Sequence, residues 1–283
     1  MFTPADRLSA IKKALSLKTL DVVVIDLEDA VSVAAKESAR EGLYAFLSTL
    51  ERRLPYPKVM VRVNCPVTTS WGTSDLESLV PLKSRVDAVL IPKVERSETV
   101  SFVANKLQRT GPQPTLWCMI ESARGVEDVH GIGKHPAVQG LVFGSNDYTK
   151  DIRAQMTSDR SHLWYALSRV VNAARAEGKS VVDGVFMELD DDGTKLDNEA
   201  RQGRAMGFDG KSMIHPKQLS VVNSAFSPDE AEVAYSQSIC DAYTEASRQG
   251  KGVCVLQGKL IEALHFDQAR QILAMFEITK DRR

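Results

Sequence analysis

The fold is indicated most directly by Leu116-Trp117-Cys118-Met119-Ile120-Glu121, an apolar run that ends in a carboxylate. A second run has the same design, Leu141-Val142-Phe143-Gly144-Ser145-Asn146-Asp147. Short apolar runs separated by helical patterns predict buried parallel strands. In a parallel (β/α)8 barrel, the carboxyl ends of the strands converge at one end. We therefore expect Glu121 and Asp147 to lie together and to bind a divalent cation, Mg2+ or alternatively Mn2+.

The alternation of strand and helix continues outward from these two runs. The other candidate strands are apolar or β-branched; they are Phe2–Pro4, Val22–Asp26, 59–63, Ala88–Ile91, 181–185 and 210–214. Helical spacing covers 5–17, 34–50 and 159–177, and Ser74-Asp75-Leu76-Glu77 has the spacing of a capping box. The sequence therefore predicts an α/β protein with a (β/α)8 TIM barrel over residues 1–228. A helix, a strand-like segment and a last helix would form a C-terminal extension over 229–283.

Composition argues against several classes of partner. The 283 residues include 36 basic and 37 acidic side chains, and no basic block is interleaved with aromatic residues, which argues against nucleic acid. No apolar stretch approaches the roughly 20 residues of a membrane span. Four scattered cysteines without a CxxC pair indicate reduced, mostly buried thiols. We expect a cytoplasmic protein, or one of the mitochondrial matrix if a targeting segment is missing.

Polar side chains gather where the expected strands end. They are Glu28, Asp29, Arg62, Asn64, Lys93, Glu95, Glu121, Asp147, Asp183 and His215. Barrel enzymes build their sites at this end of the strands, so the convergence of these groups favours an active site. For any single member, a loop carboxylate or a helix cap is the alternative.

Several motifs occur in a fixed order along the chain. They include Val24-Ile25-Asp26-Leu27-Glu28-Asp29-Ala30-Val31, Val61-Arg62-Val63-Asn64, Ile91-Pro92-Lys93-Val94-Glu95, Ile120-Glu121-Ser122-Ala123-Arg124-Gly125 and Gly210-Lys211-Ser212-Met213-Ile214-His215-Pro216. Together they resemble the citrate lyase β-subunit-like branch of the HpcH/HpaI aldolase superfamily. The segment Gly210 to Pro228, together with Leu256-Gln257-Gly258, is most similar to the citramalyl-CoA and malyl-CoA lyases of that branch.

The resemblance implies a trimeric or hexameric enzyme that carries out a Mg2+-dependent retro-Claisen cleavage. Its substrate would be a 3-hydroxy-3-carboxy acyl thioester of CoA or of an acyl carrier protein, and its products an acetyl thioester and a 2-oxo acid. Citramalyl-CoA is the first expectation, followed by malyl-CoA and citryl-CoA. The sequence is also compatible with two other functions: thioester hydrolysis of malyl- or citramalyl-CoA, and acyl-CoA binding without turnover.

The resemblance also assigns roles around the metal ligands Glu121 and Asp147. Arg62 would bind the substrate carboxylate or the oxygen that gains negative charge, or else form a salt bridge to Glu28 or Glu121. Glu28 and Asp29 would support the metal and Arg62, or cap the following helix.

The acyl-CoA itself would contact two further sets of residues. The carrier's phosphates would lie against Lys13, Arg7 and Lys36, for which a solvated surface charge is the alternative. The thioester or pantetheine channel would be lined by Phe2, Ile214 and His215, and His215 could instead satisfy a loop carbonyl.

One position departs from the family pattern. The family carries Gly-x-Met-Ile-Asp-x-Pro near its C-terminus, and its Asp acts as acid or base in the site of a neighbouring subunit. Here the matching stretch is Gly258-Lys259-Leu260-Ile261-Glu262-Ala263-Leu264. Glu262 keeps the carboxyl group but adds a methylene, and a displacement of about 1 Å can lower a rate on the order of 100-fold. Glu262 is therefore the expected acid or base, in an altered position.

Overall fold

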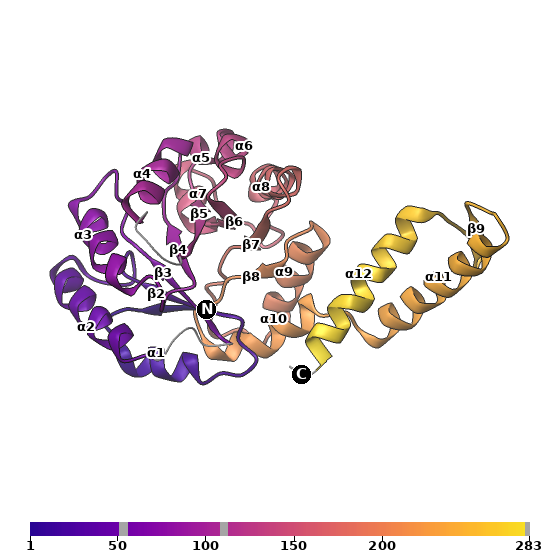
Figure 1. Ribbon diagram of the computed structural model, residues 1–283, viewed down its shortest axis with the longest axis horizontal. Helices are drawn as coiled ribbons and strands as arrows, with labels where there is room; N and C mark the ends of the chain where they lie inside the picture. The colour runs from indigo at the N-terminus through magenta and orange to yellow at the C-terminus, as the bar shows by residue number, and fades with distance from the viewer. Residues whose placement is uncertain (51–55, 108–112, 281–283) are drawn as a thin grey trace. The chain divides into compact units, whose positions relative to one another are not determined.

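The computed structural model describes residues 1–50, 56–107 and 113–280. In this part of the chain, eight parallel strands pair in sequence order to form one sheet (Figure 1). They are β1 (Phe2–Pro4), β2 (Val22–Asp26), β3 (Lys58–Arg62), β4 (Ala88–Ile91), β5 (Thr115–Ile120), β6 (Val138–Phe143), β7 (Ser180–Asp183) and β8 (Gly210–Lys211). The N–H of Phe2 donates to the carbonyl of Met213 at 2.7 Å, which links the first strand to the segment after the last one. The α/β barrel prediction is confirmed.

Helical segments follow the strands and lie outside the sheet (Figure 1). The α-helices are α1 (Leu8–Leu15), α2 (Lys36–Thr49), α3 (Ser70–Leu79), α4 (Ser97–Leu107), α5 (Ala123–Glu127), α6 (Val129–Gly133), α7 (Ser145–Asp151), α8 (Trp164–Ala176), α9 (Thr194–Ala205) and α10 (Leu219–Phe226). Short 3-10 turns are η1 (Val33–Ala35), η2 (Val80–Leu82), η3 (Ser161–Leu163) and η4 (Pro216–Gln218). A strand buried between an inner core and a helix layer needs apolar residues on both faces, which explains the continuous apolar runs.

The inside of the barrel is filled by apolar side chains from five of its strands. This interior cluster consists of Val24, Met60, Ala88, Leu90, Met119 and Val142, with Phe2, Val22, Trp117 and Val182 packed against it. Residues two apart along a strand point to the same face. The residue two positions after an interior residue therefore also points inward, toward the carboxyl end of the barrel.

The capping-box prediction at Ser74 is wrong. Helix α3 already begins at Ser70, and its N-cap is Thr69, whose hydroxyl accepts the N–H of Gly72. Ser74 lies inside the helix and donates its hydroxyl to the carbonyl of Ser70. The spacing Ser-x-x-Glu occurs by chance inside helices, so it cannot locate a helix start without the break in backbone conformation that an N-cap requires.

The chain divides into two compact units, Met1–Val222 and Asn223–Arg283. The second unit contains α11 (Glu230–Arg248), a hairpin of β9 (Cys254–Leu256) and β10 (Lys259–Ile261), and α12 (Ala263–Thr279). Its own small core joins Ile239, Ile261 and Ala269. The sequence-based division into 1–228 and 229–283 stays a prediction. None of the helices in the described ranges is long and apolar enough to cross a membrane.

Candidate active site

Charged side chains form the layer above the apolar interior of the barrel. Three of them come two positions after an interior residue: Asp26 and Arg62 end β2 and β3, and Glu121 directly follows β5. All three side chains are buried. Side chains two apart along a strand point to the same side, and the carboxyl ends of parallel strands meet at one end of the barrel. The three charged side chains therefore lie together at that end, which we call the mouth.

Arg62 is held in this mouth by Asp26. Its Nε and Nη2 donate to the two carboxylate oxygens of Asp26 at 2.7 and 2.6 Å, and its guanidinium lies 5.0 Å from the centre of the Phe2 ring. Burial disfavours the charged form, but the hydrogen bonds and charge of Asp26 raise the pKa of Arg62 above its ordinary value. Arg62 is therefore a permanent cation in a fixed orientation.

Glu28 lies between Arg62 and Lys93. Its Oε2 is 2.9 Å from Arg62 Nη1, and its Oε1 is 2.8 Å from Lys93 Nζ. Oε2 is buried and, despite the short distance, is not aligned with an N–H for a hydrogen bond. Burial raises the pKa of Glu28, although Arg62 and Lys93 act in the opposite direction.

Asp29 is the exposed member of the same group. Its carboxylate lies 3.6 Å from Lys93 Nζ and 3.9 Å from Arg62 Nη1. Neither Glu28 nor Asp29 caps the next helix, because η1 follows them and the N-cap of α2 is Ala35. The helix-cap alternative is therefore wrong for both carboxylates.

Glu121 is the most deeply perturbed carboxylate of the mouth. Its Oε1 accepts the backbone N–H of Lys93 at 2.7 Å, and Lys93 reaches this position with a φ of 52°, a conformation that non-glycine residues adopt at a cost. A Cβ on Gly144 would lie 2.5 Å from Glu121 Oε2, so only glycine leaves room for this carboxylate. Burial, together with the charges of Glu28 and Asp147, raises the pKa of Glu121 to about 8.

Asp147 comes from the first turn of α7, which directly follows β6. Its side chain is half-buried and forms no hydrogen bond or ion pair with any of the residues that the structure describes. Its charge contributes to the raised pKa of Glu121, so the two carboxylates are electrostatic neighbours. The structure thus brings together the two residues that the sequence predicts as metal ligands.

The mouth carries more negative than positive charge. In the described part of the chain, three basic groups, Arg62, Lys93 and Lys36, face five carboxylates, which are Asp26, Glu28, Asp29, Glu121 and Asp147. No three His, Cys, Asp or Glu side chains among the described residues are grouped closely enough to hold a metal by themselves. Mg2+ commonly takes one or two protein carboxylates and completes its shell with water and substrate oxygens. The donor pair Glu121 and Asp147, and the surplus of negative charge, fit that ion.

Sequence comparison identifies the family to which this chain is related. Residues 1–216 match the sequence model of the HpcH/HpaI aldolase/citrate lyase family. The chain belongs to this family. The family resemblance inferred from the motifs is therefore confirmed, and the match covers every residue of the mouth described above.

Three relatives show the range of this family. A (3S)-malyl-CoA thioesterase of Cereibacter sphaeroides is 39% identical over 98% of this chain and 93% of its own length. A citrate lyase subunit beta of Leuconostoc mesenteroides subsp. cremoris is 31% identical over 97% of this chain and 91% of its own. The crystal structure of CitE from Mycobacterium tuberculosis in complex with magnesium, acetoacetate and coenzyme A superposes with a TM-score of 0.82. It is 28% identical and covers 98% of this chain and 96% of that one.

The three residues expected to line the thioester channel of this HpcH/HpaI protein lie on two neighbouring strand regions. Phe2 in β1 is half-buried and stacks under Arg62, whereas Ile214 and His215 follow β8 and are also half-buried. His215 is the N-cap of η4, and its Nδ1 accepts the N–H of Lys217 at 3.1 Å. Capping, and not a hydrogen bond to a loop carbonyl, is thus the structural role of His215. The channel role of all three stays a prediction.

The basic residues predicted to bind phosphate divide into two groups. Arg7 is the N-cap of α1 and Lys13 lies in its last turn; both are exposed, and their phosphate contacts stay predictions. Lys36 is different, because its side chain is buried and donates to the carbonyls of Leu27 and Glu28. The phosphate role for Lys36 is therefore corrected: its ammonium serves the protein's own backbone.

Glu262 belongs to the second unit, where it is the N-cap residue of α12 and is exposed. Its N–H donates to Nδ1 of His265 at 3.1 Å. Its role as acid or base stays a prediction.

The sequence reasoning missed Asp26 as a functional residue. The sequence predicts Asp26 only as the last residue of a strand and indicates Glu28 and Asp29, in the following loop, as site residues. A usable signal was present: a charged residue at an interior position of a buried strand requires a buried partner. Arg62 is that partner.

Proposed function

We propose that this protein is a Mg2+-dependent enzyme that acts on a 3-hydroxy-3-carboxy acyl-CoA thioester of the malyl type. The observation that carries the proposal is the pairing of Glu121 with Asp147 in an anion-rich mouth beside the fixed cation Arg62. A magnesium ion and coenzyme A occur together in the CitE complex, which supports both the ion and the carrier. Bound Mg2+ supplies positive charge to the oxygens of a hydroxy acid or a thioester.

The residues of the mouth have separable tasks in this proposal. Glu121 and Asp147 hold the ion. Arg62, already fixed by Asp26, stabilises negative charge on a substrate oxygen without having to reorganise. Glu28 and Asp29, beside Arg62 and Lys93, are the carboxylates proposed to orient water and accept a proton.

Hydrolysis of the thioester is the leading reaction. Water adds to the thioester carbonyl, the C–S bond breaks, CoA leaves as the thiol and the hydroxy dicarboxylic acid is released. The support is the 39% identity to a (3S)-malyl-CoA thioesterase over nearly the whole chain. Glu262 in place of the family's Asp is consistent with hydrolysis. A displaced carboxylate is less suited to protonating an enolate and more suited to activating water for attack on the thioester.

Retro-Claisen cleavage, which the sequence resemblance places first, is the second candidate. The hydroxyl loses its proton, the C–C bond to the acetyl carbon breaks, and the electron pair forms an enolate that Glu262 would protonate to acetyl-CoA. The similarity to a citrate lyase subunit beta favours this reaction. Malyl-CoA would then give glyoxylate, citramalyl-CoA pyruvate and citryl-CoA oxaloacetate.

The second unit is proposed to pack on a neighbouring subunit of a homotrimer or hexamer and to deliver Glu262 to its site. Large exposed apolar side chains in the β9–β10 hairpin and at the start of α12 support a contact of this kind. They are Val255, Leu260 and Leu264, which are 70%, 55% and 54% exposed. The acyl carrier protein alternative and the cytoplasmic location stay predictions.

Product analysis tests the proposal. Purified protein with Mg2+ is given malyl-CoA, citramalyl-CoA and citryl-CoA, while free CoA, the free hydroxy acid, acetyl-CoA and 2-oxo acid are measured together. Free CoA in equal amount to malate is the expected result, lost in Glu121→Ala. Acetyl-CoA with a 2-oxo acid would establish the lyase instead, and its increase in Glu262→Asp would identify the acid. Binding of all three thioesters without any product would overturn the enzyme proposal in favour of a binding protein.

A further inference from the structure

Lys36 is a buried cation that contacts the backbone of the active-site loop. It is the first residue of α2 and is only 7% exposed. Its ammonium donates to the carbonyls of Leu27 at 2.8 Å and of Glu28 at 2.7 Å. Burying an ammonium is costly unless hydrogen bonds compensate it; these two hydrogen bonds provide that compensation and at the same time restrain the two carbonyls.

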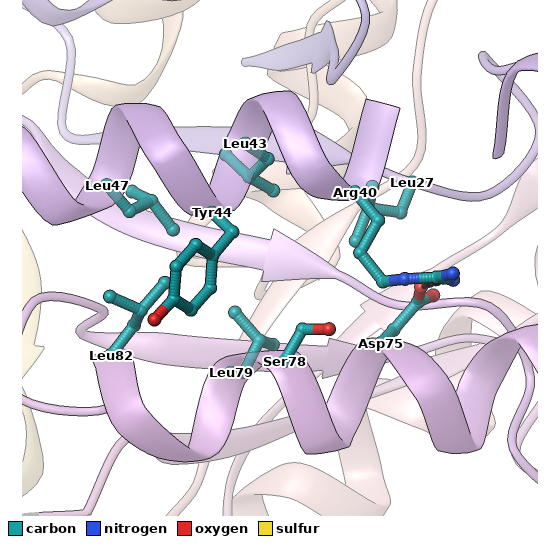
Figure 2. Close-up of a pocket in the computed structure, with 9 residues that line it drawn as sticks. All are labelled: Leu27, Arg40, Leu43, Tyr44, Leu47, Asp75, Ser78, Leu79 and Leu82. Atoms are coloured by element: carbon teal, nitrogen blue, oxygen red, sulfur yellow. Dashed lines mark hydrogen bonds and ion pairs between the residues drawn. The ribbon is translucent and has the colours of Figure 1, made fainter. Parts of the chain in front are cut away.

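Asn64 and Asp75 hold the same loop from the other side. The side-chain amide of Asn64 donates to the carbonyl of Leu27 at 2.9 Å and to Asp75 Oδ2 at 2.7 Å. Asp75 Oδ2 also accepts the N–H of Asn64 at 2.9 Å, and Arg40 Nη1 lies 3.3 Å from Asp75 Oδ1. Figure 2 shows Arg40 of α2 and Asp75 of α3 pointing toward each other beside Leu27. The loop is thus tied to the two helices that follow β2 and β3.

Gly72 explains why α3 comes close enough for this contact. A Cβ at Gly72 would lie 2.4 Å from the carbonyl oxygen of Asn64 and 2.5 Å from Cα of Pro66. Only glycine allows the first turns of α3 to pack against the segment after β3 in this way. The carboxylate of Asp75, less than one turn further along α3, then reaches Asn64.

The network fixes the backbone of Glu28 on both sides. The N–H of Glu28 donates to Asp26 Oδ1 at 2.9 Å, and its carbonyl accepts from Lys36 and from the N–H of Val31. With both backbone groups bound, the Cα–Cβ bond of Glu28 has a fixed orientation. The side chain extends from there to lie between Arg62 and Lys93.

We propose that Lys36 is a positioning residue: with Asn64 and Asp75 it holds the loop after β2 so that Glu28 faces Arg62 and Lys93 during turnover. The inference rests on the proposed function, because it assigns Lys36 to the same site. It replaces the phosphate contact that the family resemblance implies for this lysine.

The first test separates positioning from phosphate binding. Lys36→Met is compared with Lys13→Met, the exposed lysine of α1, by steady-state kinetics with malyl-CoA and by calorimetric titration with CoA alone. Lys36→Met should lower kcat on the order of 10- to 100-fold and leave the Kd for CoA within about twofold. Lys36→Arg, which keeps a donor, should restore part of kcat. A weaker affinity for CoA at unchanged kcat would overturn the proposal.

The second test asks whether Lys36 acts through Glu28. In a double-mutant cycle, Lys36→Met should have little further effect on kcat once Glu28→Gln is present. A general structural defect would instead lower kcat by the same factor in both backgrounds, which would reject the positioning role. Asn64→Ser provides a second entry into the same cycle if Lys36→Met does not fold.

A third readout does not depend on activity. Amide hydrogen exchange in residues 27–31 should become faster in Lys36→Met and stay unchanged in Lys13→Met. If the wild-type protein turns over no thioester, the proposed function fails while this measurement and the CoA titration still decide the role of Lys36. Unchanged exchange in residues 27–31 would contradict the inference whatever the reaction is.

Discussion

Two buried arginine–aspartate pairs of the barrel use the same geometry for opposite purposes. At the mouth, Arg62 donates twice to Asp26, at 2.7 and 2.6 Å. Behind the sheet, Arg160 donates twice to Asp183, at 2.6 and 2.9 Å. All four side chains are buried. The two regions differ in the charges that surround each pair.

The charges around Asp183 are balanced. Lys211 Nζ lies 3.1 Å from Asp183 Oδ2 and 2.6 Å from Glu199 Oε1, so two cations face two carboxylates in this described cluster. Burial alone would raise the pKa of Asp183, but Lys211 and Arg160 lower it below its ordinary value. A fully paired cluster of this kind leaves nothing for a ligand to neutralise and serves the fold.

The charges at the mouth are not balanced. Burial first, and then the neighbouring carboxylates Glu28 and Asp147, raise the pKa of Glu121 to about 8, because Arg62 and the N–H of Lys93 do not offset them. Strain at Lys93 and the obligatory glycine at Gly144 maintain this arrangement. Buried charges that are fully paired, as around Asp183, therefore do not indicate a functional site, whereas buried charges without enough counter-charge, as around Glu121, do.

The largest expected effect is on the balanced cluster. Asp183→Asn leaves Arg160 and Lys211 buried without their shared carboxylate and should lower the free energy of unfolding by about 3–5 kcal/mol. Denaturant unfolding measures this. Asp197→Asn, which disrupts an exposed pair with Arg201 on α9, is the matched control and should cost less than about 1 kcal/mol. Similar losses in the two variants would remove the distinction between the clusters.

Glu121→Gln should affect function and not stability. Above about pH 8, where Glu121 is ionised in the metal-free protein, the substitution removes an uncompensated charge, so the protein should unfold there at the same or a higher denaturant concentration. Mn2+ binding, followed by electron paramagnetic resonance and competed by Mg2+, should weaken by roughly 100-fold or more. Glu77→Gln, an exposed glutamate, controls for the substitution. Loss of stability comparable to that of Asp183→Asn would contradict the comparison.

The two regions should respond to pH in opposite directions. In the metal-free protein, the pKa of Glu121 is raised from 4.5 to about 8, so the folded state binds more protons than the unfolded chain between these values. The free energy of unfolding should therefore fall as pH rises through this window, and less so in Glu121→Gln.

Asp183 should act at the acid end. Its pKa is lowered in the folded state, so its stabilisation is present above the ordinary value of 3.8 and is lost as pH falls through the lowered value. The free energy of unfolding, measured at a series of pH values, should depend less on pH in Asp183→Asn at acid pH, and should keep its dependence between pH 4.5 and about 8. If Asp183→Asn or Glu121→Gln weakened the pH dependence equally in the acid and the near-neutral range, the two regions would not be independent.

The smallest effect is expected for Asp29→Asn. The Asp29 side chain is 53% exposed, and its contacts with Lys93 and Arg62 are 3.6 and 3.9 Å long. Solvent screens such a pair, so the free energy of unfolding should change by less than about 0.5 kcal/mol. Thermal unfolding measures it. A change above about 2 kcal/mol would mean that Asp29 is as strongly coupled as the buried carboxylates.

Sequence reasoning was accurate where a strand is buried on both faces. It placed β1, β2 and β4 with their observed bounds, because a short continuous apolar run has few alternatives inside a barrel. It was less accurate at β8, predicted as 210–214 and observed as Gly210–Lys211. That strand pairs over two residues only, and pairing length depends on the neighbouring strand, not on the run itself.

The strand and helix alternation, the family, and the charged residues that follow each strand can all be predicted from the amino-acid sequence. The alternation and the charged residues depend on local sequence patterns, and the family is indicated by the order of the motifs along the chain. The pairing of Arg62 with Asp26, 36 residues away, and the hydrogen bond from Lys36 to the loop carrying Glu28 become visible only in the folded protein. The physical reason is that a buried charge takes whichever partner the barrel's register brings within reach, and register is set by the pairing of all strands together.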